Sequence, residues 1–580
     1  MSIHKRFGAT WLLLALVVAG CASQPGSPAS TAGSSAPQQG AAPSGPKRIV
    51  AAVKGDGHTL SELINNVGGA SVIGVDEVEH LLNAGMVMTD DHGNLQPQLA
   101  EQVPTLDNGL WKLLPDGTMT TTLTIKPGVM WHDGAPFTSA DLVFSYQVAA
   151  DREIGTFKAP SLDSISGVEA VDDRTVVVHW KSSYIDADQT FSQAASQPAI
   201  QPMPKHLLEQ AYLSDKPNFT AQSFWSSGYI GTGAFRLKEW DMSNHVLLDA
   251  NPDFIMGRPK VDQVEVKFIN DTSALFANIL AGAVEMTMNR GLSLEQGVQL
   301  QNQWNGGRLE QKATGQLVIY PQFIDPQPSV VGDVRFRRAM VQAMDRQGMV
   351  DTLMQGQSTV AESFLNPGFA GHDIVDPYIV HYPYDQRAAQ QAIASLGYTR
   401  GSDGIFRGAD GQPLSLELRV AAGDDLNQKA TLSVANDWKN AGVDVQPAII
   451  PGSRVTDLEY TATFPAFTFT RFKNDLSRLN KFGTKNTPLP ANNYRITGNT
   501  PRYMDPAFDA LLDRYFVTIP KQDRMQLVGQ IIHTMTDQVI QMTLFFVTEP
   551  TVLSNRLVNV EGAREGVSMT WNAEKWDVKS

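Results

Sequence analysis

The clearest chemical signal in the sequence lies near its start. Val17-Val-Ala-Gly-Cys21 matches the bacterial lipobox, in which small residues admit a peptidase and the cysteine thiol receives a diacylglycerol. Before it stand Lys5 and Arg6 and an apolar run ending at Ala19, which are the charged and apolar regions of a secretory signal. That run is too short for a permanent span, which needs about 20 apolar residues. We therefore predict a signal peptide at 1–20 and a lipid anchor on Cys21.

Cys21 is also the only cysteine in the 580 residues. Because lipidation would use its thiol, we expect no disulfide, no catalytic thiol and no cysteine-based metal site in the mature chain. A chain of this length can bury a large core without disulfides.

The sequence lacks the motifs of common enzymes. It has no Gly-x-Ser-x-Gly, no His-Glu-x-x-His, no phosphate-binding loop and no complete Gly-x-Gly-x-x-Gly. His132-Asp133 has the residue types of a catalytic or metal-binding pair, but its turn-rich surroundings favour a polar turn. The 11 histidines do not cluster at metal-ligand spacing. We predict no catalytic residue, no metal and no cofactor.

Composition indicates a flexible start and an acidic, multidomain body. Residues 21–47 are rich in Ser, Gly, Pro, Ala and Gln, and such a segment is expected to remain a flexible tether. The net charge is -14, and removal of Lys5 and Arg6 would leave 44 basic and 60 acidic residues, or -16. An acidic surface argues against nucleic acid as a partner. About 530 ordered residues predict two or three domains.

Strand and helix patterns alternate through the rest of the chain, which favours α/β lobes. We expect strands at 118–125 and 174–180, and a hairpin over 403–418. We expect helices at 138–150, 333–353, 385–396, 426–440, 506–515 and 521–539. Several of these helices start at a residue that can cap them, such as Thr138, Asp333 or Asp505.

Several segments together resemble the oligopeptide, dipeptide and nickel class of solute-binding proteins of bacterial ABC importers (family 5). The most specific segment is Lys126-Pro-Gly-Val-Met-Trp-His-Asp-Gly134. The others, in chain order, are Pro97–Glu101, Gln201-Pro-Met-Pro-Lys-His206, Gly231–Leu237, Asn251–Lys260, Asp333–Arg346 and Asp385–Tyr398. Their order and spacing hold from about residue 48 to 560.

The resemblance implies a two-lobed α/β clamshell of the periplasmic-binding-protein type (type II, cluster C) with an inserted subdomain. It implies lobe I at 48–88, 205–312 and 544–580, the inserted subdomain at 89–204, and lobe II at 313–543. Residues 316–323 and 542–547 would cross between the lobes. It further implies hinge closure on a peptide or other small-molecule solute, importer permease subunits as partners, and no enzymatic activity. We expect a monomer, held at the outer face of the cytoplasmic membrane or in the periplasm by its lipid.

Ligand-binding residues are harder to predict, because the acidic loop typical of peptide-binding members is missing. The corresponding segment, 464–475, offers Arg471, which could hold a carboxylate or phosphate, and Asp475, which could hold an amine. Phe469 could stack on a ligand ring, or it could belong to the plain strand face that it forms with Phe467. The remaining candidates are His58, which a turn would explain equally well, Tyr229 and Tyr494.

The leading hypothesis is therefore an importer's solute receptor. The alternative is a lipoprotein of the same fold that senses a ligand or presents it to a membrane partner. Neighbouring genes for permeases and ATPases would favour transport.

Overall fold

The structure is a computed structural model in which the chain divides into two units, Met1–Gly45 and Pro46–Ser580. It describes residues 45–55, 59–65, 74–156, 159–193, 199–289, 291–369, 371–422, 424–454, 457–495, 498–562 and 567–579. The predicted signal peptide, the lipid site Cys21, nearly all of the predicted tether and the candidate His58 lie outside these residues. Apart from Gly45, all of the described residues belong to the second unit.

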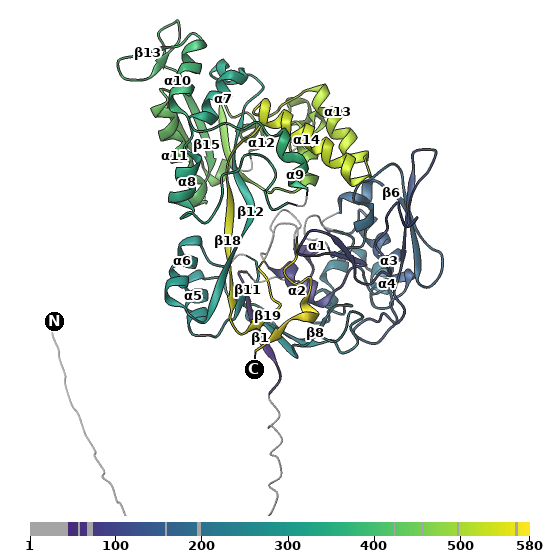
Figure 1. The fold of residues 1–580 in the computed structure, drawn as a ribbon. Helices are drawn as coiled ribbons and strands as arrows, with labels where there is room; N and C mark the ends of the chain where they lie inside the picture. Colours follow the sequence, from purple (N-terminus) through teal and green to yellow (C-terminus); the bar gives the residue numbers. More distant parts are fainter. Residues whose placement is uncertain are drawn as a thin grey trace, which may run out of the picture. The chain divides into compact units, whose positions relative to one another are not determined.

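One long mixed sheet runs through this unit (Figure 1). In the described residues its ten strands have the order β16 (Asp444–Ile450), β15 (Ser415–Ala421), β17 (Phe467–Phe472), β12 (Gly307–Pro321), β18 (Met542–Ser554), β11 (Met286–Thr287), β1 (Arg48–Val53), β10 (Gln263–Phe268), β9 (His245–Ala250) and β8 (Phe235–Asp241). Both β12 and β18 contain a predicted lobe boundary, so the sheet is continuous from one predicted lobe to the other.

Strands β12 and β18 form the connection between the two halves of the sheet. They pair antiparallel from Gly307 opposite Ser554 to Ile319 opposite Met542, with irregular register between Ala313 and Val318. β12 then pairs with β17 on the side of lobe II, and β18 pairs with β11 on the side of lobe I. The irregular stretch is therefore where a hinge between the two halves would bend.

A separate four-stranded sheet lies in the predicted inserted subdomain. Its order is β4 (Trp111–Leu113), β5 (Met119–Thr124), β7 (Thr175–Trp180) and β6 (Ile165–Ala170). Helix α3 (Ser139–Ala150) contacts β6 and β7. It begins at a capping box, because Thr138 N–H donates to Asp141 Oδ2 at 2.8 Å. The predicted strands 118–125 and 174–180 and the helix after Thr138 are thus confirmed.

Three two-stranded sheets and the remaining helices complete the unit. The small sheets pair β2 (Val87–Thr89) with β3 (Leu95–Pro97), β13 (Thr399–Arg400) with β14 (Phe406–Arg407), and β19 (Leu557–Val558) with β20 (Asp577–Val578). The helices are α1 (Glu62–Asn65), α2 (Val75–Leu82), α4 (Lys205–Ser214), α5 (Thr272–Leu280), α6 (Leu294–Gln303), α7 (Val334–Gln342), α8 (Arg346–Leu353), α9 (His372–Val375), α10 (Gln386–Ser395), α11 (Asp425–Asn440), α12 (Leu458–Ala462), α13 (Pro506–Val517) and α14 (Lys521–Asp537).

The prediction of one continuous helix over 333–353 is wrong. The segment forms α7 and α8, and Asp345 separates them. Its Oδ1 accepts the Gly348 N–H at 2.8 Å, and its own N–H donates to Asp437 Oδ2 at 2.9 Å. A residue with these bonds is an N-cap, so a new helix starts where the apolar pattern alone suggests continuation. The predicted caps Asp333 and Asp505 are confirmed, and Asp385 caps α10.

Buried side chains show how β12 divides the core. Leu317 and Ile319 belong to a cluster with residues of α7 and α11, whereas Val318 and Tyr320 belong to the largest cluster. This alternation is the period of a strand covered on both faces. Among the described residues, no helix has the length and apolar character that crossing a membrane requires.

Candidate functional site

Charged side chains from both predicted lobes and the predicted inserted subdomain lie close enough to shift one another's pKa values. We call the set the inter-lobe charge cluster. It consists of Glu62, Asp76, Asp186, Asp188, Lys473, Asp475 and Arg524. The cluster has three sides.

The first side follows the carboxyl end of β1, which is parallel to β10 and β11. Ligands of open α/β sheets bind outside the carboxyl ends of such strands. There α1 and α2 supply Glu62 and Asp76, which are half-buried, and Glu77 and Glu79, which are buried. Burial, followed by the neighbouring acids, raises the pKa of Glu62 to about 8. Carboxyls gathered this way hold protons near neutral pH.

Glu77 and Glu79 of the same helix are held by hydrogen bonds inside lobe I. Glu77 accepts from Ser568 Oγ and from Met569 N–H, and Glu79 accepts from Tyr229 Oη at 3.0 Å and from Glu62 N–H at 2.6 Å. Burial still raises the pKa of each to about 7. These bonds fix α2. Glu62 and Asp76 are the two acids whose pKa values are influenced by Lys473 of lobe II.

The second side is the segment that follows β17 in lobe II. Lys473 is exposed, and its charge acts to lower the pKa values of Glu62 and Asp76, against the larger effect of their burial. Next to it, Asn474 Nδ2 donates to Phe364 O at 2.6 Å. Asp475 then caps the 3-10 helix Leu476–Phe482 by accepting from Ser477 N–H at 2.9 Å. These bonds hold Lys473 opposite the acids of lobe I.

The third side joins the inserted subdomain to α14. Arg524 Nη1 donates to the backbone oxygen of Ile185 at 3.3 Å. Burial raises the pKa of Asp186 to about 6 and of Asp188 to about 7, while Arg524 acts to lower both. Asp475 raises the pKa of Asp186 as well. Charges that are far apart in the chain therefore meet at this contact.

The crossing strands carry a partly buried ion pair. Arg471 Nη2 donates to Glu549 Oε1 of β18 at 2.9 Å and to Thr314 Oγ1 of β12 at 2.6 Å. The side chains of Arg471 and Glu549 are 20% and 19% exposed. One guanidinium thus ties β17 to both crossing strands beside the irregular register of β12.

The predicted ligand residues fall into different environments. Arg471 is engaged at the crossing strands, and Asp475 lies in the inter-lobe charge cluster. Tyr229 is buried and donates to Glu79, while Phe469 is buried in the core of lobe II together with Phe467, as the plain strand face requires. Tyr494 is half-buried with φ +55°. The structure therefore brings Asp475, but none of the other four described candidates, into the charge cluster.

His132 of the Trp-His-Asp-Gly segment has a structural role. Its Nε2 lies 3.1 Å from Gly233 O, and its Nδ1 accepts from Gly231 N–H at 3.2 Å. Burial lowers the pKa of His132 to about 4, so the ring is neutral. A neutral ring has one N–H, which Nε2 can donate to Gly233 O, and one free nitrogen, Nδ1, which accepts from Gly231. The polar-turn interpretation holds, and within the described ranges no group of three His, Cys, Asp or Glu side chains could hold a metal.

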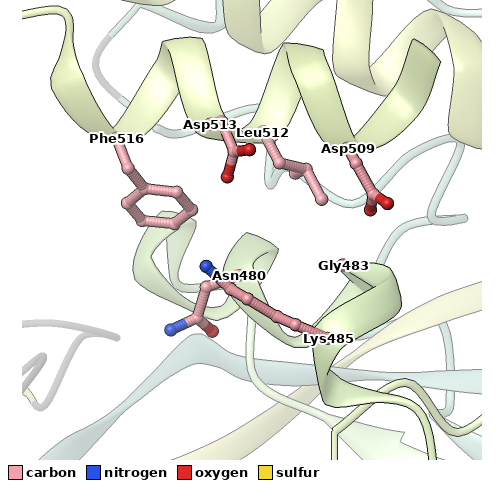
Figure 2. A pocket seen from close by; sticks show the side chains of 7 residues that line it. All are labelled: Asn480, Gly483, Lys485, Asp509, Leu512, Asp513 and Phe516. Atoms are coloured by element: carbon pink, nitrogen blue, oxygen red, sulfur yellow. The ribbon is translucent and has the colours of Figure 1, made fainter. Parts of the chain in front are cut away.

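A small cavity lies elsewhere in lobe II, between α13 and the turns after Phe482 (Figure 2). Its volume is about 140 Å³, and it is lined by Asn480, Gly483, Lys485, Asp509, Leu512, Asp513 and Phe516. Pockets for drug-sized ligands measure about 300–1,000 Å³. This cavity is therefore too small to be a peptide site.

Sequence reasoning missed Glu62, Asp76, Asp186, Asp188, Lys473 and Arg524. One signal was available for the first two, because they follow the first strand of an α/β pattern, where ligands are bound. Lys473 and Arg524 carry no local signal, since their importance comes from residues more than 300 positions away.

Two α/β halves joined by paired crossing strands, with charges of both halves facing each other, define a solute-binding protein of the two-lobed class. The chain belongs to the family described as "Bacterial extracellular solute-binding proteins, family 5 Middle", whose model matches residues 94–487. The recognition from sequence motifs is confirmed.

Known proteins support the same fold. The oligopeptide-binding protein AppA of Bacillus subtilis is 27% identical over 388 residues, which is 66% of either chain and just under two thirds. The structure of AppA with a nonapeptide covers 92% of this chain and 100% of its own, at 20% identity and a TM-score of 0.64. NikZ of Campylobacter jejuni, solved with Ni(L-His), covers 91% and 99% at 19% identity and a TM-score of 0.65. The predicted two-lobed α/β fold is confirmed, while the lobe boundaries stay predictions.

Proposed function

We propose that this chain is the extracytoplasmic receptor of an ABC importer and that it closes its two lobes on a peptide or a similar polar solute. Family membership supports the receptor role. The observation that carries the proposal is the inter-lobe charge cluster, in which charged groups of both lobes and of the inserted subdomain influence one another.

Closure works through contacts that exist only when the lobes approach. The hydrogen bond from Arg524 to Ile185 O and the attraction of Lys473 for Glu62 and Asp76 are interactions of this kind. A ligand that adds contacts to both lobes shifts the population toward the closed form. The closed monomer then docks on the permease subunits, and no covalent bond is made or broken.

A peptide fits the cluster because both signs of charge are present. The carboxylates Asp186 and Asp475 suit an amino group, and Lys473 and Arg524 suit a carboxylate. AppA, solved with a nonapeptide, is a relative in sequence and in fold. The fold also holds Ni(L-His) in NikZ, so the size of the solute is set by the side chains of each member.

A peptide panel tests this proposal. Purified mature chain is heated with defined peptides of two to nine residues, with monosaccharides and with Ni(L-His). A peptide at 100 times its dissociation constant should stabilise the protein by about 2.7 kcal/mol. Shifts with peptides alone are expected. Shifts only with sugars or with Ni(L-His), or none at all, would refute the peptide proposal.

We propose in addition that Cys21 carries the lipid that keeps the receptor at the membrane. In cells fed a radioactive fatty acid, the wild-type chain should be labelled and recovered with membranes. Cys21→Ala should lose the label completely and leave the membrane fraction, while keeping its peptide affinity. Labelling of Cys21→Ala would contradict the anchor.

A further inference from the structure

Gln316 of β12 is a fully buried amide that no described residue pairs with. Its relative exposure is 0%, and neither Oε1 nor Nε2 has a hydrogen-bond partner among the described residues. Buried polar side chains are almost always hydrogen-bonded, and each exception calls for an explanation. Burying an amide without hydrogen bonds costs free energy, which an apolar side chain of the same size would avoid. The glutamine therefore makes the folded state less stable.

Gln316 lies where the two halves of the sheet join. In the register it stands opposite Phe472 of β17 and opposite Phe546 of β18. Side chains directly opposite in antiparallel strands lie on the same face. The ring of Phe472 packs 5.7 Å from Phe364 and 5.8 Å from Phe482, so the amide has aromatic neighbours.

The end of β17 that lies opposite Gln316 leads to the inter-lobe charge cluster. Lys473 directly follows Phe472 and acts on the acids Glu62 and Asp76 of lobe I. Gln316 is therefore next to the place where the lobes meet, on the strand that would bend as they open.

A second buried glutamine provides the contrast. Gln541 is 6% exposed, and both its amide atoms also lack a partner among the described residues. It lines a cavity of about 10 Å³ together with Arg346 and Thr543. That volume is about the space one water needs, and the polar lining offers it partners. A water molecule at Gln541 would therefore have both the space and the polar partners that it needs.

Building on the proposed function, we propose that Gln316 is a ligand-binding residue whose carboxamide exchanges hydrogen bonds with a peptide group of the solute, beside an apolar side chain packed on Phe472 and Phe546. A carboxamide presents an acceptor and a donor side by side. A peptide group presents the same two functions and can satisfy both. A carboxylate would satisfy only Nε2, and an ammonium group only Oε1. The solute reaches the amide while the lobes are open.

The test combines variants with modified peptides. The peptide that gives the largest thermal shift is titrated by calorimetry into wild type, Gln316→Leu and the control Gln541→Leu. We expect Gln316→Leu to bind at least 10-fold more weakly while its unfolding midpoint without peptide does not fall. Gln541→Leu should keep its affinity within twofold.

Ester analogues of that peptide locate the bond. Replacing one peptide group by an ester removes its N–H, and at one position this should weaken wild-type binding at least 10-fold without weakening Gln316→Leu further. Equal affinity of wild type and Gln316→Leu would overturn the inference and leave the receptor function standing. If Gln316→Leu does not fold, wild type that tolerates an ester at every position would overturn it too. Wild type that binds no peptide would refute both.

Discussion

Arg471→Leu should lower the free energy of unfolding by about 3 kcal/mol, because it leaves the partly buried carboxylate of Glu549 without its cation. Arg471 also holds Thr314, so the variant loses the link between β17 and both crossing strands. Urea unfolding of the mature chain, followed by circular dichroism, measures the loss.

Two further variants separate this role from a general effect of removing an arginine. Arg335 pairs with Asp333 on the surface and is 64% exposed, so Arg335→Leu should cost less than about 1 kcal/mol. Removing both charges, as Arg471→Leu with Glu549→Leu, should recover most of the loss. If Arg471→Leu is as stable as Arg335→Leu but fails to bind peptide, the guanidinium binds the ligand. Its proposed role in linking β17 to the crossing strands is then wrong.

Glu62→Gln should stabilise the protein increasingly as the pH rises. The pKa of Glu62 is raised from 4.5 to about 8. Between these two pH values the folded state therefore keeps a proton that the unfolded state has released. The stability that protonated Glu62 contributes is fully present below pH 4.5 and is lost as the pH rises toward 8. Glutamine cannot ionise. The variant's gain should therefore grow from near zero at pH 5 to on the order of 2 kcal/mol at pH 8.

The gain is read as a difference between variant and wild type, because other groups titrate in the same range. Burial lowers the pKa values of His80 and His132 to about 4, and their stabilisation is lost in the opposite direction, as the pH falls below 6.5. Glu295, whose side chain is 63% exposed, provides a control: Glu295→Gln should change stability by less than about 0.5 kcal/mol at every pH. A difference for Glu62→Gln that does not vary with pH would disprove the protonated state of this half-buried carboxyl.

The sequence predicts elements well where the determinant is local. Thr138 with Asp141, and Asp333, Asp385 and Asp505, start helices because a side-chain oxygen meets a backbone N–H within three residues. The failure at 333–353 has a non-local part, since the N–H of Asp345 is bound by Asp437, 92 residues away.

The site depends far more on distant partners, and this limits its prediction. Arg471 has the residue type of a carboxylate-binding side chain, and it does bind a carboxylate, but that carboxylate is Glu549 of the same chain. Phe469 has a strand period compatible with either a ligand or a core, and the packing of β17 inside lobe II places it in the core. In the sequence, Gln316 is an ordinary polar residue of a strand. Only the structure shows that its side chain is completely buried.

Closure on a peptide is the central claim, and a distance across the lobes tests it most directly. Cys21 is the sole cysteine, so the mature chain with Cys21→Ala accepts two spin labels without interference. Met242→Cys beside β8 and Leu432→Cys on α11 suit them, since both residues are 61% exposed. Pulsed electron resonance should show a broad distance distribution without ligand that shortens and narrows on saturation with the peptide of largest thermal shift. A distribution that peptide leaves unchanged would contradict the account.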